Sequence, residues 1–207
     1  MQCIKDTIKN INIVIGCNIG CSYCYARMNN NRFHTIDDFN KPVFFENKLK
    51  MLDNKRHTAY LLTGQSDLSG WNEEWKDKVF SKMKENENTQ YIFLTKRPEN
   101  INLKETPDNG WFGVTVTSSK EKTRIDYLRN NIKAKHYHIT FEPMFDDVGK
   151  LDLSNISWIV IGTETGNRKG KISSKREWVF NIYNQAKEKN IPVFMKEDLL
   201  EILNEDE

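Results

Sequence analysis

Short apolar runs recur along the chain and are separated by longer polar stretches. The runs are nearly continuous and rich in β-branched and aromatic residues, a pattern typical of parallel strands that are covered on both faces. We expect seven strands, at residues 11–15, 58–63, 91–95, 111–117, 137–141, 158–162 and 192–195.

Between several of these runs, apolar residues recur every three or four positions, which is the period of an α-helix with one buried face. The longest stripe begins beside Asn72, a residue type favoured at helix N-caps. The four stripes are Phe45, Leu49 and Leu52; Trp71, Trp75, Val79 and Met83; Ile125, Leu128 and Ile132; and Trp178, Ile182 and Ala186. Residues 97–110 contain two prolines and no such stripe, so we expect a short or irregular crossover there.

Strands that alternate with helices predict an α/β protein with a parallel sheet. Seven strands in 207 residues are too few for a closed eightfold barrel of typical size, so we expect an open partial (β/α) barrel of about six to seven parallel strands. We expect residues 1–207 to form a single core domain with no appended auxiliary domain. In such folds, ligands bind at the carboxyl ends of the strands.

Composition and charge narrow the picture only a little. Hydrophobic residues make up 38% of the chain, which indicates a globular protein. The net charge of +2 neither favours nor excludes a nucleic-acid partner. No apolar run reaches transmembrane length and the N-terminus lacks a secretory signal pattern, so we expect a cytoplasmic protein with no membrane partner. Thiols stay reduced in that compartment.

Polar residues follow most of the predicted strands. Each is ordinary turn chemistry when taken singly. Taken together, at the edge where α/β folds bind ligands, they indicate one polar site. The residues are Thr63, Gly64, Gln65, Ser66 and Asp67; Lys96 and Arg97; Thr115 and Thr117; Glu142; Glu164; and Lys196.

Three of the four cysteines, Cys17, Cys21 and Cys24, fall within eight residues directly after the first predicted strand. In a reducing compartment such a cluster indicates metal binding or redox chemistry rather than disulfides. Zinc would need a fourth ligand, for which Cys3 or His34 is available. An iron–sulfur cluster held by three thiolates would keep one iron open. The spacing alone leaves both metals possible.

The segment Cys17-x3-Cys21-x2-Cys24, with Tyr23 before the last cysteine, resembles the motif of the radical S-adenosylmethionine (radical SAM) superfamily. The wider chain is similar to radical SAM mobile pair protein B and, more loosely, to a phage-associated radical-SAM-like family of unknown function. The segments that carry this resemblance are CNIGCSYCYAR, LLTGQSDLSGW, FLTKRPENI, WFGVTVT, HITFEPMFDD, WIVIGTETG and IPVFMKEDL.

The resemblance implies an enzyme of the radical SAM type with a 4Fe-4S cluster bound by Cys17, Cys21 and Cys24. The open iron would chelate S-adenosylmethionine, whose reductive cleavage gives a 5′-deoxyadenosyl radical that abstracts hydrogen from a substrate. An electron donor such as flavodoxin or ferredoxin and a second radical SAM protein, the mobile pair A partner, are the implied partners. The substrate is unidentified, and the wide mouth expected of an open barrel suggests a macromolecule.

The resemblance also assigns roles to the strand ends. Tyr23 is expected beside the adenine, and Thr115 and Thr117 at the ribose. Residues 63–65 stand where the superfamily has a Gly-Gly-Glu motif that meets the methionine amino group, with Ser66 and Asp67 as further candidates. Lys96 or Arg97 is expected at the methionine carboxylate. The candidates for substrate contact or proton transfer are Glu142, Glu164 and Lys196.

Two other hypotheses each explain part of these observations. One is a zinc-stabilised nucleic-acid-binding module that uses the basic turns at 168–171 and 175–176. The other is a catalytically silent iron–sulfur protein that assists a second radical SAM protein. Apart from its place as a possible fourth zinc ligand, Cys3 has no assigned role.

Overall fold

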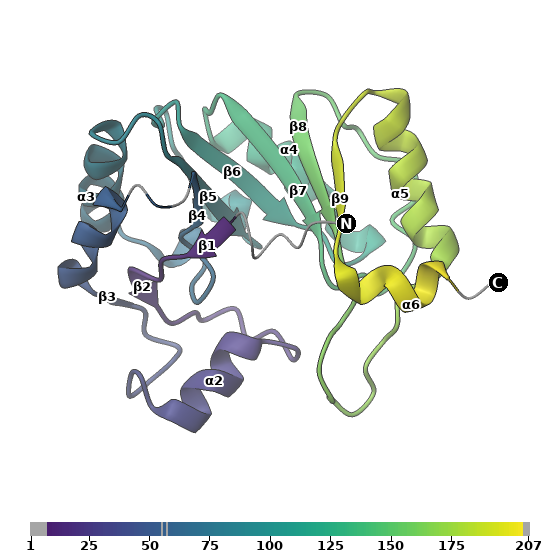
Figure 1. The fold of residues 1–207 in the computed structure, drawn as a ribbon, viewed down its shortest axis with the longest axis horizontal. Helices are drawn as coiled ribbons and strands as arrows, with labels where there is room; N and C mark the ends of the chain where they lie inside the picture. Colours follow the sequence, from purple (N-terminus) through teal and green to yellow (C-terminus); the bar gives the residue numbers. More distant parts are fainter. Residues whose placement is uncertain (1–7, 55, 57, 205–207) are drawn as a thin grey trace.

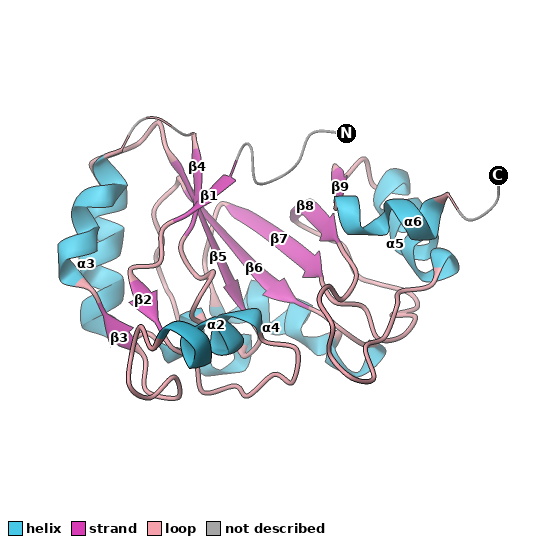
Figure 2. Ribbon diagram, turned by 60° about the horizontal axis from the view of Figure 1, so that its bottom comes forward, coloured by secondary structure: helices cyan, strands magenta, loops and turns pink. Residues whose placement is uncertain are grey.

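The computed structural model describes residues 8–54, 56 and 58–204. Seven parallel strands form one open sheet in the order β1-β4-β5-β6-β7-β8-β9 (Figure 1). The strands are β1 (Ile8–Asn10), β4 (Ala59–Leu61), β5 (Gln90–Thr95), β6 (Gly110–Thr115), β7 (His136–Phe141), β8 (Ile156–Ile161) and β9 (Val193–Met195). The sheet curls into a half-barrel, so the expected α/β class and open partial barrel are confirmed (Figure 2).

Three helices cover the outer face of this sheet, and they match three of the four predicted stripes (Figure 1). They are α3 (Glu73–Lys84), α4 (Thr123–Asn131) and α5 (Arg176–Glu188). The Asn72 side chain accepts a hydrogen bond from the backbone N–H of Trp75 at 2.9 Å, which confirms it as the N-cap of α3. The apolar stripes pack into the core, where Val79, Leu128 and Ile182 are fully buried.

Aromatic packing joins the central strands to the helical layer. The rings of Phe93 on β5 and Phe112 on β6 stack with centroids 4.9 Å apart, and Phe80 of α3 meets both edge-on. Alternate residues of the same strands line the concave face, where Trp111 stacks on His136 at 4.4 Å. The helical layer therefore anchors the middle of the half-barrel, and the concave face remains available for a ligand.

The first predicted strand is wrong as a single element. The chain pairs with β4 over Ile8–Asn10, and β2 (Val14–Ile15) instead pairs antiparallel with β3 (Val43–Phe44). A parallel bridge between Gly16 and Ser66 then returns the chain to the sheet edge. Gly16 has a φ of +115°, and a Cβ there would lie 2.8 Å from the Cα of Pro42, so only glycine fits this return.

Two helical segments differ from the expectation. The stripe at 45–52 forms a 3₁₀ segment, η1 (Glu46–Asp53), rather than an α-helix. Helix α2 (Tyr25–Phe33), directly after the cysteines, has no counterpart in the predicted elements. The remaining short elements are η2 (Leu68–Gly70), η3 (Pro98–Asn100), η4 (Ser119–Glu121), η5 (Glu197–Leu199) and α6 (Leu200–Leu203). The irregular crossover predicted for 97–110 is confirmed, with η3 as its helical turn.

Across the part of the chain that the structure describes, no helix has the length and apolar character needed to cross a membrane.

Candidate functional site

The three clustered cysteines lie on the loop between β2 and α2, at the carboxyl edge of the half-barrel. Backbone hydrogen bonds hold the base of this loop, from Gly16 N to the Gln65 carbonyl at 3.0 Å and from Cys17 N to the Phe39 carbonyl at 2.6 Å. Cys24 is the N-cap of α2, where its Sγ accepts from the Arg27 N–H at 3.4 Å. All three thiols are half-buried. The loop follows the run 11–15 as expected, but the end of that run forms β2, which lies outside the seven-stranded sheet.

The three thiols lie within electrostatic range of one another. Burial raises the pKa of the Cys17 thiol to about 11, a hydrogen bond from the Ile19 backbone opposes this, and Asp67, Cys21 and Cys24 add to the rise. Within the described residues, no three His, Cys, Asp or Glu side chains are gathered closely enough to hold a metal ion. The donor set itself, three soft thiols on one loop, fits an iron–sulfur cluster, which binds thiolates.

The fourth zinc ligand suggested by the sequence is not supplied by His34. That residue is the C-cap of α2 and is exposed, with nine helical residues between it and Cys24. At the α-helical rise this separates the two by about 15 Å. The other suggested ligand, Cys3, lies outside the described residues.

Two side chains of α2 fasten the cysteine loop from below. The Arg27 guanidinium donates to the Cys17 carbonyl at 2.8 Å and to Asn40 Oδ1 at 2.9 Å, and it lies over the Phe39 ring. The buried Asn30 amide donates to the carbonyl of Ile36 and accepts from its N–H, at 2.9 and 3.0 Å. These contacts tie α2 to the following turn and fix the backbone that carries the cysteines.

Tyr23 lies in a cluster of mixed chemistry beside the cysteine loop. Its ring meets Phe145 edge-on with centroids 5.3 Å apart, and the Lys96 ammonium lies 5.7 Å from the ring centroid. Burial raises the pKa of Tyr23, nearby Cys21 and Glu121 raise it further, and Arg124 lowers it. The structure thus brings Tyr23 and Lys96 together, as expected of one site. It adds two charged groups, Glu121 from η4 and Arg124 from the first turn of α4.

Residues 63–67 mostly hold the site together. The Thr63 hydroxyl accepts from the Leu94 N–H at 2.7 Å, and the Ser66 hydroxyl accepts from the Trp71 indole N–H at 3.0 Å. The Gly64 carbonyl accepts from the Tyr25 hydroxyl at 2.5 Å. Together with the Gln65 carbonyl, which meets Gly16, this segment fastens the cysteine loop and the start of α2 to the end of β4.

Asp67 is the most engaged carboxylate of this segment. It is buried and accepts from the Thr95 hydroxyl at 2.6 Å and from the Lys96 N–H at 2.8 Å. It also caps η2 by accepting from the N–H and hydroxyl of Ser69. Its side chain therefore joins the ends of β4 and β5.

Thr115, at the end of β6, and Thr117, just after it, contact two residues that the sequence analysis did not single out. Thr117 donates through both its N–H and its hydroxyl to Glu121 Oε2, at 2.7 Å each. Arg124 pairs with the same carboxylate at 2.9 Å and donates to the Thr115 carbonyl at 2.8 Å. Charged residues at the start of a helix are ordinary, so the sequence gives no signal that would separate Glu121 and Arg124 from a solvated surface.

The three acid–base candidates do not form one group. Lys196 on the far edge makes an ion pair with Glu142, and Gly162 leaves room for it, since a Cβ there would lie 2.9 Å from the Lys196 Cδ. Glu164 instead pairs with Arg168 at 2.5 Å. The hydrogen bonds from Arg168 and from the Ile172 N–H hold the pKa of Glu164 below its ordinary value. Arg97 reaches Asn18 of the cysteine loop at 3.4 Å.

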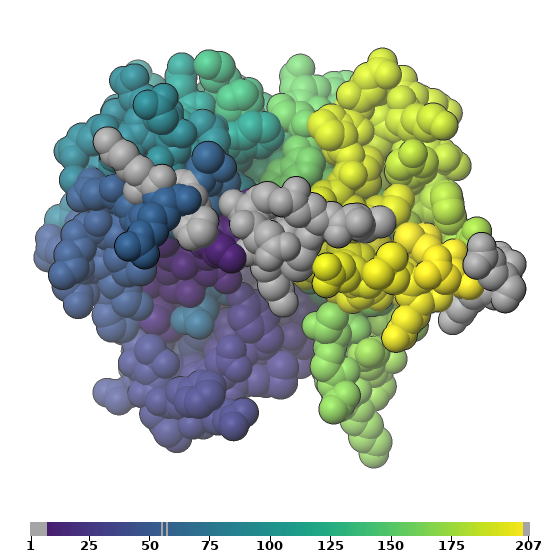
Figure 3. Space-filling model, in the orientation of Figure 1, coloured from purple at the N-terminus to yellow at the C-terminus, as the bar shows by residue number. Residues whose placement is uncertain are grey.

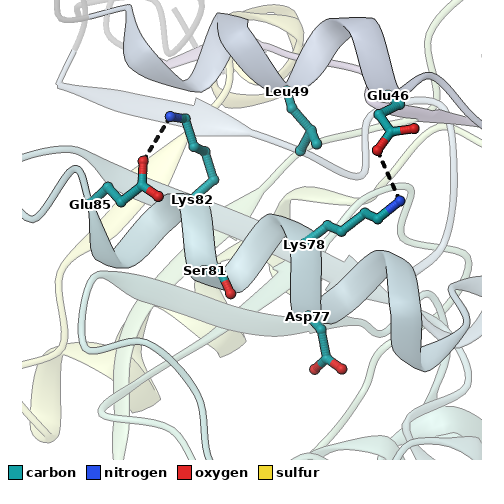
Figure 4. A pocket seen from close by; sticks show the side chains of 7 residues that line it. All are labelled: Glu46, Leu49, Asp77, Lys78, Ser81, Lys82 and Glu85. Atoms are coloured by element: carbon teal, nitrogen blue, oxygen red, sulfur yellow. Dashed lines mark hydrogen bonds and ion pairs between the residues drawn. The ribbon is translucent and has the colours of Figure 1, made fainter.

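Two grooves on the molecule lie away from the cysteine loop. One, of about 400 Å³, runs between η1 and α3 (Figure 4). The ion pair Lys78–Glu46 crosses it, and the pair Lys82–Glu85 lies at the end of α3. The other, of about 290 Å³, is mainly apolar and is lined by Trp111 and Trp158 near the amino ends of the strands. The charged side chains that line the first groove include these ion pairs within the outer layer. Neither groove is lined by a predicted site residue.

Comparison with known proteins places the chain in a family without supplying an activity. Residues 2–198 match the family described as protein of unknown function (DUF5131), and the chain belongs to that family. No curated protein and no solved structure matches it significantly.

Proposed function

We propose that this protein is a radical S-adenosylmethionine enzyme. The observation that carries the proposal is the Cys17-x3-Cys21-x2-Cys24 loop at the carboxyl edge of a parallel half-barrel, beside an aromatic and cationic cluster. Open positions on a metal centre and polar groups at strand ends are the features by which such folds bind reactive ligands.

In this proposal, Cys17, Cys21 and Cys24 hold a 4Fe-4S cluster. When bound and reduced, the cluster supplies the electron that cleaves S-adenosylmethionine to methionine and a 5′-deoxyadenosyl radical. The protein's own contribution is to bind, orient and enclose the reactants. Arg27 and Asn30 fix the backbone around the loop that carries the three thiols.

The surroundings of Tyr23 supply binding groups of the right kinds. In this proposal the Tyr23 ring stacks on the adenine, and Lys96 or Arg97 pairs with the methionine carboxylate. Thr115 and Thr117 remain the proposed ribose contacts, although the Thr117 hydroxyl already donates to Glu121. Arg124, which no strand-end pattern singles out, is a further cation beside Tyr23.

The ion pair of Glu142 and Lys196 is the proposed acid–base pair on the substrate side. The pair lies at the ends of β7 and β9. Burial, the Cys24 thiol and the Glu142 carboxylate, in that order, raise the pKa of the Tyr25 hydroxyl, so Glu142 lies near Tyr25. A carboxylate and an ammonium in contact can pass a proton without leaving a buried charge unpaired. Glu164 is directed into the loop that follows β8 and is the weakest of the three candidates.

Metal content of cysteine variants tests the cluster. Anaerobically purified protein is expected to be brown with about four irons per chain. Cys17→Ala, Cys21→Ala and Cys24→Ala are each expected to lose most of the iron, whereas the matched control Cys3→Ser is expected to keep it. A colourless protein with one zinc per chain would contradict the proposal and favour the zinc-stabilised module instead.

The partners implied by the resemblance stay predictions. A flavodoxin or ferredoxin is expected to deliver the electron, and the mobile pair A partner is expected to co-purify with the protein. If the cluster is present and S-adenosylmethionine is not cleaved, the accessory role beside that partner becomes the better account.

A further inference from the structure

Two segments that project from the carboxyl edge of the sheet carry an unusual share of positive charge. They are helix α2 and the loop 165–176, which leaves β8 and reaches into α5. Together they hold seven of the 31 Lys and Arg residues of the chain and none of its 29 Asp and Glu residues. The remainder of the chain is therefore net acidic, and the small total of +2 conceals a strongly one-sided distribution.

Both segments extend beyond the same edge of the half-barrel. Figure 1 and Figure 2 show α2 and the loop below the carboxyl ends of the strands, with the cysteine loop between them. Figure 3 shows the loop, in light green, as a projection beside the blue-violet lobe that contains α2. A ligand that crosses the mouth of the half-barrel would meet both.

The loop is held in shape by its own buried ion pair. Glu164 is 4% exposed and accepts from the Arg168 Nε and Nη2 and from the Ile172 N–H. Arg168 also donates to the carbonyls of Lys169 and Gly170. At the other end, the Ser174 N–H donates to the Thr163 hydroxyl at 3.0 Å. These contacts hold the backbone of the loop that carries the exposed Lys169 and Lys171.

Helix α2 presents aromatic and apolar side chains on its exposed face. Tyr25, Met28 and Phe33 are 52%, 55% and 65% exposed. The helical period puts Tyr25 and Met28 on the side away from the buried Ala26 and Asn30, whereas Phe33 is the last residue of the helix. The Tyr25 ring is held in place by the hydrogen bond from its hydroxyl to Gly64, at the mouth itself. The Arg32 guanidinium lies 5.1 Å from the Phe33 ring centroid.

Glu164 neutralises Arg168, whereas Lys169 and Lys171 of the same loop are exposed. Two other carboxylates near the mouth are engaged elsewhere, Glu142 with Lys196 and Asp38 with Lys41. The mouth thus combines a cationic loop on one side with exposed rings on the other. A chain of phosphates with unstacked bases complements both features, since cations track the backbone and rings stack on bases.

We propose that single-stranded nucleic acid binds across this mouth, with its phosphates on the 165–176 loop and its bases against Tyr25 and Phe33, and that it is the substrate class of the site. As a statement about substrate, the proposal rests on the function proposed above. As a statement about binding, it stands independently, because the surface does not include the cysteines.

Binding of a fluorescent oligothymidylate to the full-length, cluster-loaded protein tests the surface. Fluorescence anisotropy is measured between about 50 and 200 mM salt, with an oligonucleotide of roughly 20 nucleotides. K169E/K171E is expected to weaken binding at least about tenfold and to reduce the salt slope by about 1.4, the value for two phosphate contacts to a single strand. Phe33→Ala is expected to weaken it about fivefold through lost stacking.

The matched control is K84E/K187E, which makes the same change in net charge. Lys84 and Lys187 are exposed near the carboxyl ends of α3 and α5, which lie at the opposite edge of the sheet, so less than a twofold change is expected. Equal losses in the two double variants would overturn the proposal. Displacement of the oligonucleotide by polyglutamate as readily as by unlabelled oligonucleotide, or tighter binding of a duplex, would also overturn it.

The readout does not require S-adenosylmethionine cleavage, so the two proposals fail separately. Cleavage with no oligonucleotide binding would overturn only the nucleic-acid surface. Binding that depends on Lys169, Lys171 and Phe33 in a protein that cleaves no S-adenosylmethionine would support the surface and overturn only the proposed reaction.

Discussion

Asp67 was predicted as a cofactor contact from its position at a strand end, but its hydrogen-bond partners in the structure are other residues of the protein. The resemblance gives it a contact with the methionine amino group, but its oxygens accept from Thr95, Lys96 and Ser69. A buried carboxylate with several donors is costly to remove, because the donors are left unsatisfied. Its first role in the structure is to join two strand ends beneath the site.

We predict that Asp67→Ala lowers the free energy of unfolding by about 3 kcal/mol, as measured by urea denaturation. Asp77→Ala, at an exposed position of α3, is the control and is expected to change it by less than about 0.5 kcal/mol. A variant at Asp67 with unchanged stability and lost cofactor binding would contradict the structural role and favour direct cofactor contact.

His138 is a buried titratable residue that the sequence pattern did not single out. Its ring lies on the concave face over Gly113, where a Cβ would come within 2.3 Å of it, and its Nε2 contacts the Phe93 carbonyl at 3.0 Å. Burial lowers the pKa of His138 to about 4, and hydrogen bonds to the carbonyls of Phe93 and Trp111 oppose that shift. The folded protein therefore holds this histidine neutral.

Because the folded pKa is below the unfolded value of about 6.5, the unfolded chain binds the proton first as pH falls. Stability should therefore decrease from about pH 6.5 down to about pH 4. We predict a loss of about 2 kcal/mol between pH 7 and pH 5 by urea denaturation, most of which is absent in His138→Gln. Burial and Lys135 also lower the pKa of the half-exposed His136, so His136→Gln serves as a comparison that should keep most of the loss. An unchanged pH dependence in His138→Gln would contradict this assignment.

Among the longer helices, α2 was the one that the sequence pattern did not predict. Its residues, YARMNNNRF, contain three consecutive asparagines and no long apolar stripe, and its N-cap is a cysteine rather than Ser, Thr, Asp or Asn. Tertiary contacts decide its formation, chiefly the buried Asn30 amide and the Arg27 clamp. The stripe at 45–52 shows the converse case, since helical spacing alone does not distinguish a 3₁₀ segment from an α-helix.

The Arg27 clamp should matter more for the cysteine loop than for the whole fold. We predict that Arg27→Ala lowers the iron retained per chain to below about half, through loss of the bond to the Cys17 carbonyl, while global stability falls by only about 1 kcal/mol. Arg32→Ala, on the same helix, is the control and should retain iron normally. Equal iron content in the two variants, measured after anaerobic purification, would contradict a positioning role for Arg27.

At the scale of the whole molecule, the sheet was predictable and the charge distribution was not. Six of the seven predicted runs coincide with strands of the half-barrel, because buried parallel strands must be apolar throughout. The first failed because the chain leaves the sheet at Asn10 and returns only at Gly16. A balanced total charge could not reveal that folding gathers α2 and the 165–176 loop at one edge.

The candidate site was predicted in outline for the same reason. Parallel topology brings the cysteine loop, Tyr23 and Lys96 to one edge regardless of side-chain detail. What the pattern could not provide is the choice of partner for each side chain, such as Glu164 with Arg168, or the contribution of Glu121 and Arg124. Those choices depend on distances of a few ångströms, which strand order does not determine.

The most direct test of the central claim is release of 5′-deoxyadenosine by the cluster-loaded protein. With dithionite and S-adenosylmethionine under anaerobic conditions, chromatography is expected to show 5′-deoxyadenosine formed by the native protein and by Cys3→Ser, and none formed by Cys17→Ala. No 5′-deoxyadenosine from native protein that holds about four irons per chain would contradict the account.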